Sequence, residues 1–111
     1  MKESEIESVF SKNTLLVQKQ IKKDFASFEL NFPLDFDTEI YSKDAIIQIL
    51  EESVVSLVEL GERKTLQVLY TIDISENRFL SLTQKPDFAK NLAFEILNRE
   101  IQKVYYRIKY S

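Results

Sequence analysis

Carboxylates are the side chains of this sequence that best suit chemistry, because the chain contains no His and no Cys. Those two absences exclude disulfides, thiolate metal sites, cysteine nucleophiles and Ser-His-Asp triads. The single glycine, Gly61, excludes the common Gly-rich phosphate-binding loops. Asp73 and Glu76 could form a carboxylate pair, but their spacing also fits a helix capping box with Asp in first place, which we favour. The sequence therefore predicts no catalytic residue, no cofactor and no metal site, and a protein that is not an enzyme.

Glu100 lies in a C-terminal segment whose apolar residues recur with helical spacing. On a helix, Glu100 points into the middle of the apolar stripe. A carboxylate there must be paired, hydrogen-bonded or neutral, because burying a lone charge costs several kcal/mol. The candidate partners are Arg63, Arg78 and Lys103. We favour a buried ion pair that fixes the helix register. An acid of raised pKa lining a pocket and a poorly buried Glu at a helix end are the alternatives.

The last thirteen residues are basic, although the whole chain has a net charge of −3. Glu100 is the single acidic residue of this segment, which contains four cations: Arg99, Lys103, Arg107 and Lys109. The favoured interpretation is that they oppose the negative end of a helix dipole, and Glu95 and Arg99 have the spacing of a surface pair. Tyr105, Tyr106 and Tyr110 are interleaved with these cations. This pattern also suits single-stranded nucleic acid, a protein interface or a partly buried helix end.

Three segments of the N-terminal half have distinct patterns. Apolar spacing predicts a helix over residues 5–27, and alternation over 28–37 predicts an extended aromatic segment that Pro33 keeps from being a central strand. Residues 43–60 form the next predicted helix, with Ser42 as N-cap and Gly61 after its end. The apolar residues of this helix fill about half of its circumference, so we expect it to be central. Val55 falls outside that arc, and the remainder carries Asp44, Glu51, Glu52 and Glu59.

Residues 62–74 fit either a strand or a short helix. The next segment fits either a further helical turn through Leu82 or the returning half of a hairpin that ends at Thr83. Pro86 suits the first turn of a last helix. The preferred architecture is a mainly α single domain, residues 1–111, built as a small bundle of four or five helices with the extended segment at 28–37. The alternative is an α+β domain whose antiparallel sheet uses residues 28–36, 65–74, 78–83 and 103–110.

Two segments of the C-terminal half resemble a group of short, uncharacterised bacterial conserved proteins. The segments are Leu-Tyr-Thr-Ile-Asp-Ile-Ser-Glu at 69–76 and Arg-Glu-Ile-Gln-Lys-Val at 99–104. The resemblance covers about residues 57–107 and implies no activity. It implies a polar, helical C-terminal segment and therefore favours helix over residues 87–107. The tyrosines at the end of this chain depart from that pattern.

Composition indicates an ordinary globular chain, since 44% of its residues are hydrophobic and 30% are charged. No targeting segment or membrane span is visible, so we expect a cytoplasmic protein with no membrane partner. The leading hypothesis is a small non-enzymatic protein-interaction domain that binds a protein partner or forms a homo-oligomer. The alternative is a nucleic-acid-binding module that uses the basic C-terminal tail. The candidate structural or interaction residues are Asp73, Glu76, Arg99, Glu100, Lys103, Tyr106 and Arg107.

Overall fold

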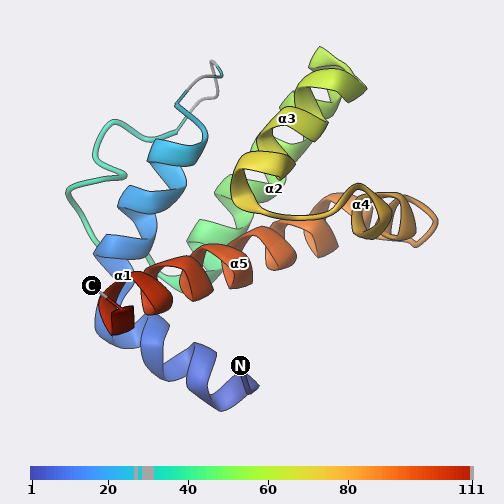
Figure 1. Ribbon diagram of the computed structural model, residues 1–111. Helices are drawn as coiled ribbons and strands as arrows, with labels where there is room; N and C mark the ends of the chain where they lie inside the picture. The colour runs from blue at the N-terminus through green and yellow to red at the C-terminus, as the bar shows by residue number, and fades with distance from the viewer. Residues whose placement is uncertain (27, 29–31, 111) are drawn as a thin grey trace.

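A computed structural model describes residues 1–26, 28 and 32–110 of the chain, and these residues contain five α-helices and no strand (Figure 1). The helices are α1 (Glu3–Asp24), α2 (Lys43–Leu60), α3 (Glu62–Ile72), α4 (Glu76–Thr83) and α5 (Phe88–Tyr110). The predicted small helical bundle is confirmed. The α+β alternative is wrong for the described residues, because the segments 65–72, 78–83 and 103–110 are all helical.

The central element is α5, which packs against each of the other four helices. Its core residues are completely or almost completely buried: Leu92, Ala93, Ile96, Leu97, Ile101 and Val104. The prediction that α2 is central is wrong, since α2 contacts α5 and α3 and leaves Val55, Val58 and Leu60 exposed. Part of the wide apolar arc of α2 is therefore not covered by other helices.

Local capping explains where α2, α3 and α4 begin and end. The Ser42 hydroxyl accepts a hydrogen bond from the backbone N–H of Ala45 at 3.1 Å, which confirms the predicted start of α2. Gly61 follows α2 with a φ of +117°, a conformation that L side chains rarely adopt. Asp73 is not the predicted N-cap, because it ends α3 in the left-handed conformation, and the Ser75 hydroxyl caps α4 instead.

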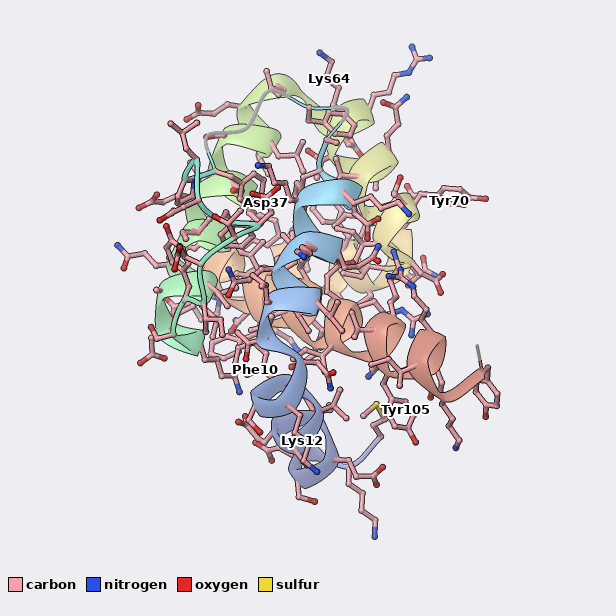
Figure 2. The ribbon with its side chains drawn as sticks, turned by 90° about the vertical axis from the view of Figure 1, so that its left-hand side faces the viewer. Phe10, Lys12, Asp37, Lys64, Tyr70 and Tyr105 are labelled. Atoms are coloured by element: carbon pink, nitrogen blue, oxygen red, sulfur yellow. The ribbon has the colours of Figure 1, made fainter. Side chains whose placement is uncertain are left out.

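Helix α1 is kinked at Asn13, whose φ of −134° and ψ of 28° are not helical. The Asn13 side-chain amide donates to the carbonyl of Val9 at 2.9 Å, and Thr14 donates to the carbonyl of Phe10 at 2.7 Å. Side chains that bond to preceding carbonyls compete with the helical ladder and bend it. The bend separates the stretch around Lys12 from the rest of α1 (Figure 2). The helix ends at Asp24, earlier than the predicted end at residue 27, which lies outside the described residues.

The extended aromatic segment predicted at 28–37 is wrong for residues 34–37, which form turns together with Thr38. Residues 29–31 of that segment lie outside the described residues. Phe36 donates its N–H to the carbonyl of Pro33 at 3.0 Å, and local bonds of this kind replace an extended backbone. Leu34 is 98% exposed, whereas Phe36 is buried and packs on Phe32 with ring centroids 5.1 Å apart.

Gln18 attaches this turn segment to α1 through three hydrogen bonds, although sequence reasoning did not single it out. Its buried side-chain amide donates to the carbonyls of Phe36 and Glu39, each at 2.7 Å. Its side-chain oxygen accepts from the N–H of Tyr41 at 2.9 Å. A polar side chain of 0% exposure is stable here because all these bonds are made.

Replacing Gln18 with Leu is expected to lower the free energy of unfolding by about 3 kcal/mol, because two carbonyls and one N–H lose their partner. Urea unfolding followed by circular dichroism measures the change. Gln67→Leu is the matched control, since the Gln67 side chain lies on α3 and takes no part in the attachment of the turn segment. Equal losses in the two variants would contradict the attaching role of Gln18.

Candidate functional site

The polar residues predicted near the C-terminus meet α1 and α3 in a network around Lys103 and in the neighbouring Arg99–Asp73 pair, which together we call the polar cluster. It consists of Gln20 and Asp24 of α1, Thr71 and Asp73 at the end of α3, and Arg99, Glu100, Lys103 and Arg107 of α5. These α5 residues share one side of the helix, because Arg99, Lys103 and Arg107 are each four apart and Glu100 precedes Lys103 by three. Five of the seven predicted site residues are therefore brought together: Asp73, Arg99, Glu100, Lys103 and Arg107.

Lys103 is the centre of the polar cluster. Its ammonium nitrogen lies 2.6 Å from Oδ2 of Asp24 and donates at 3.1 Å to the backbone carbonyl of Thr71. It also lies 3.7 Å from Oε1 of Glu100, one helical turn earlier on α5. One cation thus joins α5 to both α1 and α3. It lies closer to the carboxyl group of Asp24 than to that of Glu100.

Glu100 is completely buried, with 0% of its side chain exposed, which confirms the burial that the helical pattern indicated. Of the predicted partners, Lys103 is present and Arg63 and Arg78 are not. Neither Glu100 carboxyl oxygen accepts a hydrogen bond from the described residues. Burial, together with the hydrogen bond and the negative charge of Asp24, raises the pKa of Glu100 to about 9, against the opposing effect of Lys103. Glu100 is therefore protonated at neutral pH, and its carboxyl O–H can donate a hydrogen bond to Asp24.

Asp24 has the opposite protonation behaviour, although its side chain is only 7% exposed. Burial alone would raise the pKa of Asp24, but hydrogen bonds from Glu100, Lys103 and Gln20 and the charge of Lys103 hold it below its usual value. The side-chain amide of Gln20 donates to Oδ1 of Asp24 at 3.0 Å, and Arg107 donates to the oxygen of the same amide. The result is one ionised and one neutral carboxyl group beside a single ammonium.

Arg99 and Glu95 do not form the predicted pair with each other. The guanidinium of Arg99 pairs with Asp73 at the end of α3 and donates to Oε1 of Gln102 at 2.9 Å. Glu95 instead pairs with Arg78 of α4, whose Nε lies 3.0 Å from Oε1 of Glu95. Each pair connects α5 to a different helix, so tertiary contacts prevail over the local spacing of Glu95 and Arg99.

Glu76 and Tyr106 lie outside the polar cluster. Glu76 is exposed in the first turn of α4, where a carboxylate opposes the positive end of the helix dipole. Tyr106 is exposed near the end of α5 and contacts the rings of Tyr105 and Tyr110, with centroids 5.3 and 6.2 Å away. Neither residue is among the groups that set the pKa values of Asp24 and Glu100.

The polar cluster contains an acid and a base in opposite protonation states, which is the pattern of many catalytic carboxyl pairs. Its central acid, however, has no surface that a substrate can reach. The described residues include no group of His, Cys, Asp or Glu that could hold a metal ion. The arrangement therefore fixes α1, α3 and α5 relative to one another, in the way that buried polar networks specify a unique packing.

A groove between α2 and α5 is the second feature that could act on another molecule. It has a volume of about 860 Å³, and Val55 and Phe94 lie in it, 47% and 37% exposed. Its charged lining consists of Asp44, Glu51, Glu52, Glu59 and Lys90. The sequence analysis did not predict this groove. The signal for it was Val55, an apolar residue that lies outside the apolar arc of α2.

Four helices arranged around α5, with a buried polar cluster and an acidic surface groove, define a small all-α domain in the described part of the chain. Comparison with known proteins found no matching family model, no similar curated protein and no similar solved structure. The resemblance of the segments at 69–76 and 99–104 to bacterial proteins stays a prediction. Among the described residues, no helix has the length and apolarity needed to cross a membrane.

Proposed function

We propose that this chain is a small, non-enzymatic protein-interaction domain whose contact surface is the groove between α2 and α5. The observation that carries the proposal is the exposure of Val55 and Phe94 within a groove that also holds four carboxylates. Apolar side chains rimmed by polar ones are typical of protein contact sites. The buried polar cluster supports the same function, because it holds α5, one wall of the groove, in a fixed position.

The nucleic-acid alternative has less support from the arrangement of the basic residues. Arg99 pairs with Asp73, Lys103 with Asp24, and Arg107 donates to Gln20. Three of the four tail cations are thus engaged inside the domain. Binding to phosphates depends on the number of cations that can contact them, so the tail offers a small footprint.

A pull-down from native cell extract tests the proposal with tagged wild-type protein and a groove variant, Val55→Lys. We expect the wild type to recover specific proteins, which include untagged copies of its own chain if it self-associates. The groove variant should lose them. Nuclease treatment should leave the recovered proteins unchanged.

Leu80→Lys is the matched control, because Leu80 is a similarly exposed apolar residue on α4, away from the groove. It should recover the same proteins as the wild type. Partners that disappear with nuclease, or that persist in Val55→Lys, would contradict the proposed function.

A further inference from the structure

We propose that the groove between α2 and α5 binds the C-terminal end of α5 from a second copy of this chain. The result is a head-to-tail assembly. The inference rests on the proposed function and names the partner of the same groove.

The groove carries a strong local excess of negative charge. Its four carboxylates face one ammonium, that of Lys90. Within the described part of the chain, none of these five charged groups forms a salt bridge. A mixed acidic and apolar groove is complementary to a segment that combines aromatic rings with positive charge. The carboxylates, in order, are Asp44, Glu51, Glu52 and Glu59.

The C-terminal end of α5 has this complementary chemistry, and we call its residues Tyr105, Tyr106, Lys109 and Tyr110 the aromatic end. The ammonium of Lys109 lies 5.5 Å from the ring centroids of both Tyr105 and Tyr110. Tyr106 and Tyr110 stack on each other, and Tyr110 is 73% exposed. Figure 2 shows Tyr105 at this end of the helix. Rigid tyrosines are among the residues that contribute most to protein contacts.

The aromatic end cannot enter the groove of its own chain. Phe94 of the groove and Tyr110 of the aromatic end belong to the same uninterrupted helix, α5 (Figure 1). Sixteen residues of α-helix separate them by about 24 Å, since each residue rises about 1.5 Å. The occupant of the groove must therefore come from another molecule, and a second copy always provides the complementary end.

Contact between two different surfaces of the same chain is heterologous, so it produces open chains or closed rings rather than a simple symmetric dimer. The groove is small compared with standard protein interfaces, and we expect a dissociation constant on the order of 100 µM. The attraction of carboxylates to Lys109 should weaken as salt increases from about 50 mM to about 500 mM.

Three double variants test the assembly by sedimentation velocity over a range from about 20 µM to about 1 mM. The groove variant is Glu52→Lys with Glu59→Lys, and the end variant is Tyr106→Ser with Lys109→Glu. The control is Glu39→Lys with Glu62→Lys, which makes the same charge change at exposed residues outside the groove. Circular dichroism establishes that each variant retains the helical fold.

We expect the groove and end variants each to associate at least tenfold more weakly than the wild type, while the control associates normally. An equimolar mixture of the two defective variants should restore a one-to-one complex that grows no larger. The reason is that the mixture contains one intact groove and one intact aromatic end.

Three results would overturn the inference. Wild-type association that persists in both defective variants would show that another surface is used. Loss in each variant without restoration in the mixture would show a symmetric contact. A wild type that is monomeric at every concentration would exclude the second copy. In that last case the proposed function still stands if Val55→Lys loses a different protein in the pull-down, and it fails as well if no protein is captured.

Discussion

Replacing Glu100 with Gln is expected to raise the free energy of unfolding at pH 7 by about 3 kcal/mol. The unfolded chain ionises Glu100 near the ordinary glutamate pKa of 4.5, whereas burial and Asp24 raise the folded pKa to about 9. Folding at neutral pH therefore requires Glu100 to take up a proton. Gln has nearly the same shape and is always neutral, so the variant folds without this cost.

The stabilisation depends on pH with a definite sign. Because the folded pKa of Glu100 lies above the unfolded one, its contribution to stability is fully present below pH 4.5 and is lost as pH rises to about 9. The difference between Glu100→Gln and wild type should therefore be small near pH 4.5, grow through neutral pH and level off above about pH 9. Urea unfolding at several pH values measures this difference directly.

Glu52→Gln is the control for Glu100→Gln, because Glu52 is exposed on α2. It should change stability little at any pH. A Glu100→Gln variant that is less stable than wild type from about pH 5 to about pH 8 would contradict the neutral state of Glu100. That result would instead support an ionised Glu100 paired with Lys103, the interpretation that the sequence favoured.

A helix could be predicted from the sequence where its apolar residues have a clear helical period and where capping residues mark both of its ends. Helix α2 has a wide apolar arc, Ser42 at its start and Gly61 after its end, and its bounds were correct. The segment that became α3 was ambiguous, because its apolar residues fit both a strand and a helix. Burial of Val68, Leu69 and Ile72 against the other helices resolves the ambiguity, and this burial depends on residues distant in the sequence.

The turn segment after α1 shows where period-two alternation misleads. Phe32 and Phe36 are four residues apart and pack together, while Leu34 between them is exposed. The alternation of apolar residues therefore did not correspond to one buried face. Gln18 provides the missing constraint, since its three bonds hold the turn to α1. No local pattern indicates which polar residue on α1 will bond to a segment about twenty residues away.

The candidate site was predictable in part, on α5 alone. Glu100 was recognisable because a helical projection places it in the apolar stripe, and Lys103 because it lies one turn away. Asp24 was missed, although the same projection places it about 20° from Val17 on the buried side of α1. Its partnership with Glu100 joins residues that are distant in the sequence. The protonation state of Glu100 depends on that partnership, so it could not be deduced from α5 by itself.

Replacing Lys103 with Met is expected to lower the free energy of unfolding at pH 7 by about 3 kcal/mol, because it leaves the buried Asp24 carboxylate without its cation. The ammonium of Lys103 lies 2.6 Å from Asp24 and also bonds to the carbonyl of Thr71. Met keeps most of the apolar stem, so the loss reports the charge rather than the packing. Lys90→Met, at an exposed position of the same helix, should change stability little.

A double-mutant cycle with Asp24→Asn isolates the contribution of the ion pair. If the cost of Lys103→Met arises from an unpaired Asp24 carboxylate, most of it should disappear in the Asp24→Asn background. The cost in the wild-type background should also fall as pH decreases and Asp24 becomes protonated, because its folded pKa rises once Lys103 is removed. An unchanged cost in both backgrounds would assign the loss to packing of the lysine stem. A large coupling would instead identify the Asp24–Lys103 pair as the contact that holds α5, and with it one wall of the groove, against α1.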